Sequence, residues 1–247
     1  MDIHTLTPAK DPMGAAIADY YQKGKASCLR VCSSLFDEDE IPVSLLFREE
    51  AEMPKLERIA LAKAQGRILD VGAGSGCHTL ALQQRGLEVE AIDISPLSVD
   101  VMQQRGVRKA RLANLFDSHW YDRYDTILML MNGSGIVGKI AHLPAFFQRL
   151  KQLLTPDGCV WMDSSDIRYV FENEDGSMDI DLAANYYGEV DYQMIYRNVT
   201  GDAFDWLYID FETLSYYASA HGFIAEKIAD GDHYDYLACL RQETGTR

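Results

Sequence analysis

The chain has 247 residues, 47% of them hydrophobic, so it is long enough to bury a substantial core as one large domain or two small ones. Its formal net charge is −15, because 38 acidic residues outnumber 23 basic ones. This balance argues against a protein that binds nucleic acid or an anionic membrane surface, since both kinds of binding need clustered lysine and arginine.

Residues 1–66 are predicted to form an N-terminal helical extension. A helix is expected over residues 11–22, because Asp11 can cap it and Pro12 suits its first position. A second helix is expected to open at Met53 and Pro54 and to run through residue 64. We interpret the extension as a cap that precedes the first strand of the following domain.

The segment 66–80 carries the most specific signal in the chain. A short apolar run ends in Asp70, and glycines follow at 72, 74 and 76 before a helical sequence, which predicts a strand, a tight loop and a helix. Glycine permits positive φ angles and lets a ligand approach the backbone, while the start of the helix offers unpaired N–H groups. The pattern indicates a loop that binds a nucleotide-type cofactor.

Strands and helices continue to alternate as far as residue 163, with short connections that predict a doubly wound, mostly parallel sheet. The expected strands cover residues 67–70, 87–93, 108–113, 124–131 and 159–163, and the expected helices cover residues 77–85, 96–105 and 143–154. The run 124–131 is nearly all apolar, as is typical of a central strand that is covered on both faces.

Residues 164–205 interrupt this order and are predicted to form an acidic, aromatic insertion with a strand-like stretch at 192–198. A helix is then expected over residues 211–221. Two further strands, at 223–229 and 234–241, are separated by a turn and predict an antiparallel hairpin.

The motif that begins at Asp70 resembles the first motif of the class I S-adenosylmethionine-dependent methyltransferases, an acidic residue followed by x-G-x-G-x-G. The sequence Leu154-x-Pro156-x-Gly158 before the fifth strand and the terminal hairpin are also similar to this family. The resemblance implies an α/β domain over residues 67–247 with a seven-stranded, mostly parallel sheet and a C-terminal antiparallel hairpin. It also implies S-adenosylmethionine as the methyl donor and S-adenosylhomocysteine as the product.

The resemblance further implies which residues hold this cofactor. They are Asp70, Gly72, Ala73, Gly74 and Gly76 in the loop, then Asp93 and Ile94, Asn114 and Leu115, and Met131. Asp70 suits the cationic amino group of the methionine half, and Asp93 ends the second strand, where a carboxylate has two acceptors for a ribose diol. The family usually has an aspartate in place of Asn114, so Asp117 is the alternative contact for adenine.

The acceptor site is predicted from the loop after the fourth strand and from the two extra segments. The loop 132–135 lacks the prolines and the aromatic residue that members of the family acting on nucleobases or glutamine carry here, which disfavours those substrates. We therefore predict a small-molecule acceptor, and the candidate contacts are Tyr20, Tyr21, Arg48 and Asn132.

No residue has a spacing that marks it as a catalytic base. A base is needed only if the acceptor is protonated, because the sulfonium of the cofactor is already activated. The candidates are Asp163, Asp166, His142, Tyr20, Tyr21, Tyr187 and Tyr196. No metal is expected, since the acidic stretch 172–181 fails the spacing test for a calcium loop.

Three other functions are alternatives at this point. An NAD-dependent oxidoreductase would share Asp93, but Asp70 and the missing glycine at position 77 weigh against it. A regulatory protein that binds S-adenosylmethionine without turnover is excluded by no feature of the sequence. A protein methyltransferase would need an open groove, whereas we expect the extra segments to close the pocket.

The five cysteines are scattered and predict reduced, mostly buried thiols. Cys28 and Cys32 are expected to lie one helical turn apart, which is unlike a zinc site. The first ten residues lack the pattern of a secretion signal, and no apolar run reaches the length of a membrane span. We therefore expect a cytoplasmic protein, acting as a monomer or a homodimer.

Overall fold

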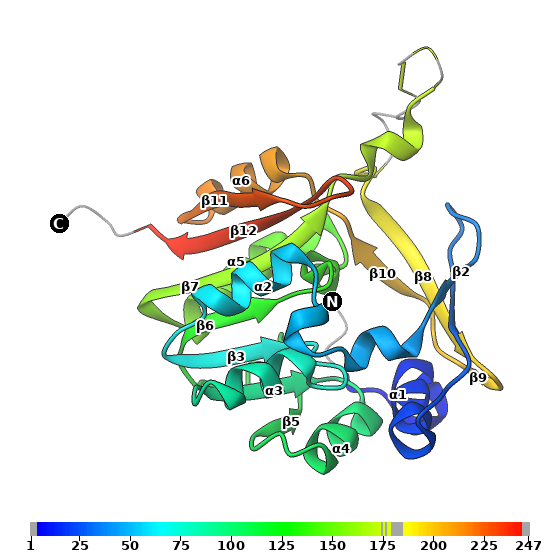
Figure 1. Cartoon of the computed structure of the whole chain (residues 1–247). Coiled ribbons are helices and arrows are strands. Elements are labelled where there is room, and N and C mark those ends of the chain that lie inside the picture. The colour runs from blue at the N-terminus through cyan, green and yellow to red at the C-terminus, as the bar shows by residue number, and fades with distance from the viewer. Residues whose placement is uncertain (1–3, 174, 176, 179–184, 244–247) are drawn as a thin grey trace.

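The computed structural model describes residues 4–173, 175, 177–178 and 185–243. Its main body is a seven-stranded sheet with the order β11-β12-β7-β6-β3-β4-β5 (Figure 1). The strands are β3 (Arg67–Val71), β4 (Glu88–Asp93), β5 (Ala110–Leu112), β6 (Tyr124–Met129), β7 (Leu154–Ser165), β11 (Phe223–Asp230) and β12 (Asp235–Gln242). Strands β3 to β7 are parallel, whereas β12 is antiparallel to β7 and to β11. The predicted α/β fold with its terminal hairpin is confirmed.

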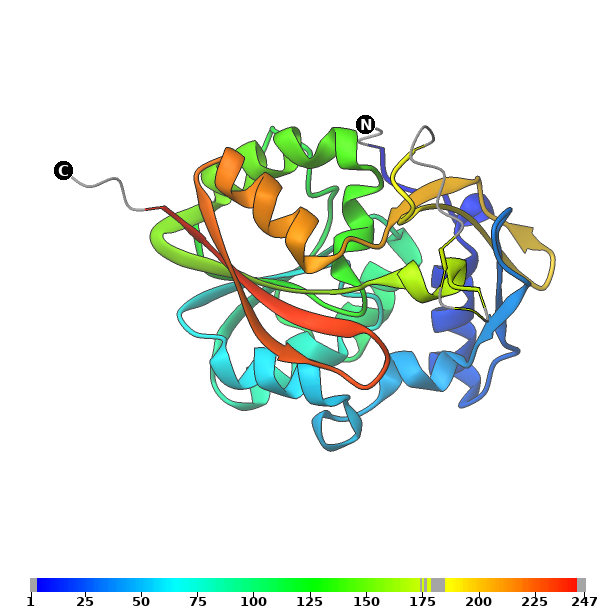
Figure 2. The same ribbon diagram turned by 90° about the horizontal axis from the view of Figure 1, so that it is seen from above.

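Helices cover both faces of this sheet. They are α2 (Lys55–Lys63) and α3 (Cys77–Gln84) on one face, and α5 (Leu143–Leu153) and α6 (Phe211–Ala220) on the other (Figure 2). Strand β6 contributes to both resulting cores, since Ile127 packs in the core under α5 and α6 while Leu128 packs in the core under α2 and α3. Neither face of a strand that is buried on both sides contacts solvent, which explains the uninterrupted apolar run in this stretch.

Two helices begin where the sequence places capping residues. Helix α1 (Pro12–Lys23) follows Asp11, whose carboxylate accepts the N–H of Gly14 at 2.8 Å. Helix α4 (Pro96–Gln104), which packs on β4 and β5, follows Ser95, whose hydroxyl accepts the N–H of Ser98 at 2.9 Å. In both helices proline fills the first position, as the capping pattern predicted.

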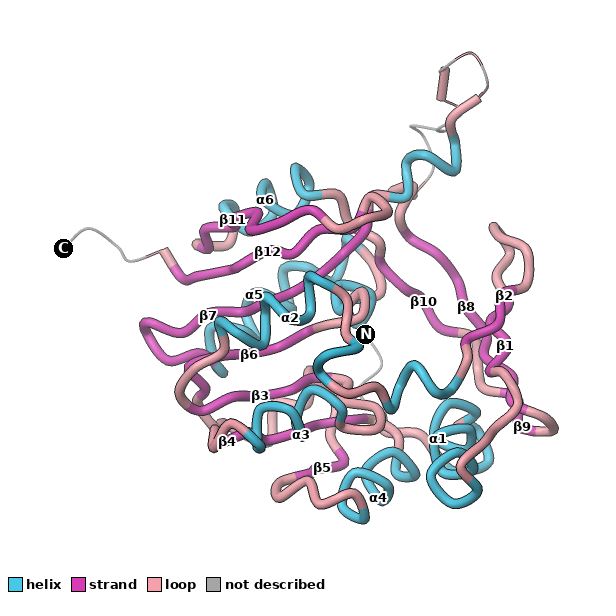
Figure 3. Tube along the Cα trace, in the orientation of Figure 1, coloured by secondary structure: helices cyan, strands magenta, loops and turns pink. Residues whose placement is uncertain are grey.

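A second sheet, which the sequence analysis did not predict, joins the N-terminal extension to the insertion (Figures 1 and 3). Its order is β10-β8-β1-β2, with β9 also paired to β8. The strands are β1 (Leu29–Cys32), β2 (Asp39–Ile41), β8 (Glu189–Tyr196), β9 (Val199–Thr200) and β10 (Phe204–Leu207). The predicted helical spacing of Cys28 and Cys32 is wrong, because the chain is extended here and Arg30 pairs with Ile195 of β8.

Short 3₁₀ helices make up much of the remaining structure. They are η1 (Pro8–Lys10), η2 (Val43–Phe47), η3 (Glu50–Glu52), η4 (Gly133–Val137), η5 (Ile140–His142) and η6 (Ile167–Phe171). Strand β7 begins at residue 154 and not at the predicted residue 159, so the motif Leu154-x-Pro156-x-Gly158 belongs to the strand itself. Among the described residues, none of the helices combines the length and the apolar character that a membrane crossing requires.

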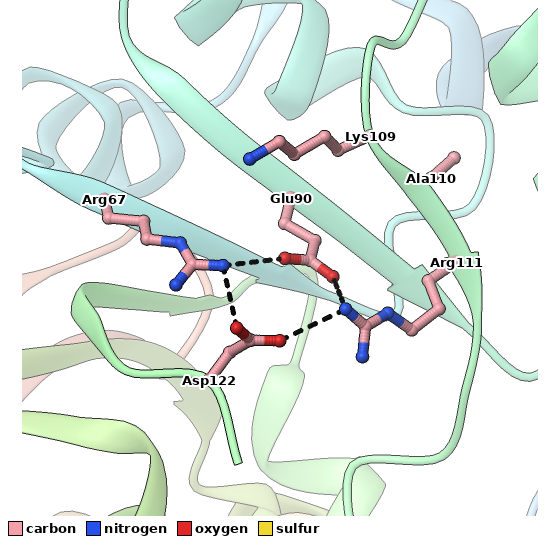
Figure 4. Close-up of a pocket in the computed structure, with 6 residues that line it drawn as sticks. All are labelled: Arg67, Glu90, Lys109, Ala110, Arg111 and Asp122. Carbon is pink, nitrogen blue, oxygen red and sulfur yellow. Dashed lines mark hydrogen bonds and ion pairs between the residues drawn. The ribbon is translucent and has the colours of Figure 1, made fainter. Parts of the chain in front are cut away.

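A network of ion pairs surrounds Glu90 near the amino-terminal ends of the parallel strands (Figure 4). Glu90 is 5% exposed and lies within 3.4 Å of the Arg67 guanidinium and 2.5 Å of the Arg111 guanidinium. The hydroxyl of Tyr124 also donates to Glu90, at 2.9 Å. Asp122 lies 3.2 Å from each arginine, so two acids and two arginines form a closed ring of charges. This network ties β3, β4 and β5 together.

A pocket of about 360 Å³ lies over this network and is also lined by Lys109 (Figure 4). Lys109 is paired with Glu88 at 2.7 Å, so each charged side chain that lines the pocket has a partner. The pocket lies where β3 and β5 begin, at the end of the parallel strands opposite to the predicted cofactor loop. We therefore assign it a structural role.

Candidate functional site

The predicted glycine loop connects the carboxyl end of β3 to α3. Gly72, Gly74 and Gly76 have φ angles of +70°, +56° and +83°, which other residues rarely adopt. The N–H groups of Gly72 and Ala73 donate to the carbonyl of Ile92 at 2.9 and 3.1 Å, so the loop is fastened to the neighbouring strand β4. Gly72 itself is exposed, which leaves one face of the loop open to a ligand.

Asp93 ends β4 beside this loop. Its Oδ2 accepts the N–H of Gly74 and its Oδ1 accepts the N–H of Ser95, both at 2.8 Å. Burial, together with the smaller effect of the nearby carboxylates Asp11 and Asp70, raises the pKa of Asp93 to about 6 in spite of these two hydrogen bonds. Each carboxylate oxygen has two acceptor positions, so Asp93 retains capacity for the hydroxyls of a ribose. Its contact with a ribose stays a prediction.

The affinity for S-adenosylhomocysteine is expected to fall as the pH drops through about 6. A ribose that donates hydrogen bonds to Asp93 favours the ionised carboxylate, so binding requires loss of the proton that Asp93 carries at acidic pH. The dissociation constant, measured by calorimetry, should be about tenfold higher at pH 5 than at pH 7. Asp93→Asn should bind more weakly and without this dependence. A wild-type affinity that stays constant between pH 7 and pH 5 would remove Asp93 from the ribose site.

Asp70 lies in β3, two residues before Gly72, and is almost completely buried. Its Oδ2 accepts a hydrogen bond from the hydroxyl of Thr79 at 2.6 Å. Burial raises the pKa of Asp70, although the charge of His78 and the hydrogen bond from Thr79 act in the opposite direction. The helix that follows the loop thus holds the carboxyl group of Asp70 in place, and its contact with the cofactor stays a prediction.

The residues predicted to contact adenine differ in their surroundings. Ile94 is 38% exposed just after the carboxyl end of β4, and its carbonyl accepts the N–H of Leu6 at 2.8 Å. Leu115 is buried in the main core, and the side-chain oxygen of Asn114 accepts the N–H of Phe116 at 3.0 Å. The alternative residue, Asp117, bonds to His119. Of these candidates, Ile94 exposes the most apolar surface at the carboxyl end of the parallel strands.

The loop after β6 has an unusual backbone. Met131 and Asn132 have φ angles of +67° and +58°, and neither is a glycine. Asp163 of β7 holds this turn, since its carboxylate accepts the N–H of Met131 at 3.1 Å and that of Gly133 at 2.9 Å. Burial raises the pKa of Asp163 to about 6, while the N–H bonds lower it. Backbone strain of this kind gathers at functional sites and persists only where the surroundings enforce it.

The side chain of Asn132 adds a second unusual feature. Its amide nitrogen and oxygen are both buried, and neither has a hydrogen-bond partner among the residues that the structure describes. An unsatisfied buried polar group costs about 1–3 kcal/mol. An asparagine offers two donors and one acceptor, so a ligand with a hydroxyl or an amino group could satisfy it.

Elements of the two extra segments lie against these loops. The indole of Trp206 in β10 occupies the space that a side chain at Gly135 would need, so the strand in which the predicted insertion ends packs directly on the loop after β6. On the other side, the Cδ1 atom of Ile17 in α1 lies 3.9 Å from the position of a Cβ at Gly74. The N-terminal extension and the insertion therefore both reach the carboxyl end of the parallel strands.

Four residues are predicted to contact the acceptor, and the side chains of three of them interact with other residues of the protein. The ring of Tyr20 packs on Phe47, with 4.6 Å between the centroids. The hydroxyl of Tyr21 donates to the carbonyl of Gln104 at 3.1 Å. Arg48 forms a buried ion pair with a glutamate of α2. Asn132 is the fourth, and its polar atoms are the ones left without a partner.

The candidate bases are likewise engaged in structural contacts. Asp163 holds the turn after β6, and Asp166 accepts a hydrogen bond from Tyr187 at 2.8 Å. The Nδ1 atom of His142 lies 2.9 Å from a backbone carbonyl, and Tyr196 donates to a carboxylate of α1 at 2.9 Å. The geometry therefore marks none of them as a base.

The structure also bears on the question of a metal. Within the described part of the chain, no group of three or more histidine, cysteine or acidic residues is placed to hold a metal ion. Glu174, Asp179 and Asp181 of the acidic stretch lie outside the described residues.

Comparisons with known proteins agree with this geometry. A family model described as a methyltransferase domain matches residues 46–220. The crystal structure of a SAM-dependent methyltransferase from Bacteroides fragilis in complex with S-adenosyl-L-homocysteine has 62% identity to this chain and a TM-score of 0.94, and it covers 99% of this chain and 100% of that one. No curated protein sequence matches the chain.

More distant structures share the fold alone. The CcbJ methyltransferase from Streptomyces caelestis has 16% identity and a TM-score of 0.63, with 94% of this chain and 98% of that chain covered. The sugar N-methyltransferase KedS8 from Streptoalloteichus has 15% identity and a TM-score of 0.55, with 86% and 97% covered. The family match spans the glycine loop, Asp93 and the turn after β6. The chain belongs to the class I S-adenosylmethionine-dependent methyltransferases.

Proposed function

We propose that the protein transfers the methyl group of S-adenosylmethionine to a small molecule held between the carboxyl end of the parallel strands and the second sheet. The observation that carries this proposal is the buried amide of Asn132, which is unpartnered and stands in a strained turn that Asp163 enforces. The packing of Trp206 and Ile17 on the two loops supports a closed site, and such a site suits a small acceptor better than a folded protein.

We assign cofactor binding to Asp70, Gly72, Ala73, Gly74, Gly76, Asp93, Ile94, Asn114, Leu115 and Met131. The cofactor supplies an activated methyl group, so the protein has to bind both reactants, orient them and exclude water. Asp93 has acceptors for the ribose, and the exposed side chains of Ile94 and Met131 offer apolar surface at the same edge. The elements from the N-terminal extension and the insertion would keep water from this edge.

We assign acceptor binding to Asn132, and Asn132→Gly tests this assignment. Glycine adopts the left-handed backbone readily, so the variant should fold and bind S-adenosylhomocysteine within about twofold of the wild type. Loss of the amide should lower kcat/KM for the acceptor by roughly 10- to 100-fold, the cost of one or two hydrogen bonds to a buried group. An unchanged kcat/KM would place the acceptor elsewhere.

The first experiment for the proposed function is a calorimetric titration of the purified protein with S-adenosylhomocysteine, with NADH as the control. We expect binding of the first compound alone. A screen of small metabolites carrying hydroxyl or amino groups should then identify an acceptor through the formation of S-adenosylhomocysteine. Binding of NADH alone would contradict the cofactor assignment. Cofactor binding without turnover in the whole screen would favour a regulatory protein.

We further propose that the protein acts in the cytoplasm as a monomer or a homodimer and without a nucleic-acid partner. The net charge of −15 supports the last point, because it opposes contact with a phosphate backbone. Size-exclusion chromatography with light scattering would determine the oligomeric state.

A further inference from the structure

A buried ion network connects the N-terminal extension to the helix that follows the glycine loop. Arg48 follows η2, Glu57 lies in the first turn of α2, and His78 is the second residue of α3. Their side chains are 8%, 6% and 5% exposed. Arg48 donates to Glu57 at 2.5 Å, and the Nε2 atom of His78 lies 2.6 Å from Oε2 of the same carboxylate. Three elements thus meet at one glutamate.

The members of this network shift one another's pKa values. Burial by itself would lower the pKa of His78, but the hydrogen bond to Glu57 and the charges of Asp70 and Glu57 raise it. Burial opposes ionisation of Glu57 as well, yet its bonds to His78 and Arg48 bring its pKa below the usual value. Arg48 and His78 therefore both bond to Glu57, and Asp70 lies near enough to His78 to influence its pKa. Removing one member leaves a buried charge uncompensated, which is far more costly than losing an exposed pair.

The same segment also touches the glycine loop directly. The hydroxyl of Ser75 donates to the carbonyl of Leu46. Arg105 of the α4 terminus donates to the carbonyl and the hydroxyl of Ser75, each at 2.6 Å, and its guanidinium lies 4.7 Å from the centroid of the Phe47 ring. Leu46 and Arg105 therefore hold the loop at Ser75, and Phe47 packs on the side chain of Arg105.

We propose that Arg48, Glu57 and His78 are positioning residues for the cofactor. They fix the segment 43–57 against the start of α3, so that the glycine loop has its binding shape before the cofactor arrives. When the loop is already ordered, cofactor binding loses no conformational entropy in ordering it. A more mobile loop would lose this entropy on binding, and the affinity would be lower. The inference rests on the proposed cofactor site, since it concerns the approach of S-adenosylmethionine to this loop.

The test compares Glu57→Gln and His78→Gln with a control variant, Glu50→Gln. Glu50 pairs with Arg85 at the far end of α3, so the control removes an ion pair between the same two segments, but an exposed one. Calorimetry with S-adenosylhomocysteine should show about tenfold weaker binding for the first two variants and less than a twofold change for the control. Hydrogen exchange at residues 72–79 should be faster in the two variants without ligand and recover on binding.

The outcomes separate this inference from the proposed function. If the wild type does not bind S-adenosylhomocysteine, the proposed cofactor site is wrong. If the wild type binds and the folded variants bind equally well, with faster exchange across the whole sheet, the network has only a structural role. Where a variant fails to fold, Arg48→Lys keeps one charged donor to Glu57, and its affinity should lie between those of the wild type and His78→Gln. Wild-type affinity in Arg48→Lys together with wild-type affinity in His78→Gln would overturn the inference.

Discussion

Replacing Gly72 with valine is expected to weaken binding of S-adenosylhomocysteine strongly. The φ angle of +70° disfavours any side chain, and a β-branched one most of all, by at least about 1–2 kcal/mol. A Cβ here would lie 3.1 Å from Cδ1 of Ile136, and the larger side chain would occupy the open face of the loop. Calorimetry should show the affinity reduced at least about 100-fold, which corresponds to roughly 3 kcal/mol.

Gly86→Val is the matched control for this experiment. Gly86 has a φ angle of +80°, so valine causes the same kind of backbone strain, but no atom lies within 4 Å of its Cβ position. It stands after the other end of α3, away from the loop. This variant should be less stable than the wild type and still bind S-adenosylhomocysteine with wild-type affinity. Wild-type affinity in Gly72→Val as well would show that the cofactor does not approach this loop.

Replacing Glu90 with alanine is expected to lower the free energy of unfolding by about 3 kcal/mol. Breaking a buried ion pair by removing one partner costs roughly 3–5 kcal/mol, and the partial exposure of Arg67 and Arg111 brings the expected value to the lower end of this range. The hydroxyl of the fully buried Tyr124 would also lose its acceptor. Denaturation by urea measures the effect.

Asp122→Ala gives the comparison for this variant. Asp122 contacts the same two arginines, but its side chain is 36% exposed, so its removal should change the free energy of unfolding by less than about 1 kcal/mol. Neither variant should alter the affinity for S-adenosylhomocysteine, because the network lies at the opposite end of the strands. Equal losses of stability would show that the burial of Glu90 does not decide the strength of the network.

The main sheet could be predicted because its signals are local. Capping residues, helix-ending glycines and the apolar run of β6 each lie within a short window of sequence. The second sheet could not be predicted in this way. Strands β1 and β2 have four and three residues, and β1 is stabilised by pairing with β8, a segment far away in the chain. A short strand with a distant partner leaves no periodicity to detect.

The residues of the candidate site also differ in whether local sequence predicts them. The glycine loop and Asp93 follow from the order of residues along the chain, whereas the ion network of Glu57 depends on contacts among three elements. Its one sequence signal is a glutamate and a histidine at positions that the helices bury. Asp163 was a candidate base from its place at a strand end, and it bonds instead to the turn after β6. Such roles depend on tertiary packing.

The pairing of β1 with β8 has a consequence for synthesis of the protein. A ribosome produces β1 and β2 early, and the glycine loop and most of the main sheet follow before Glu189 opens β8. Until then β1 lacks one of its neighbours, and its unpaired edge is open to other chains. Nascent chains that stop before this point should therefore aggregate. The second sheet, which we assign to the acceptor site, is therefore completed after the glycine loop, which we assign to the methyl donor.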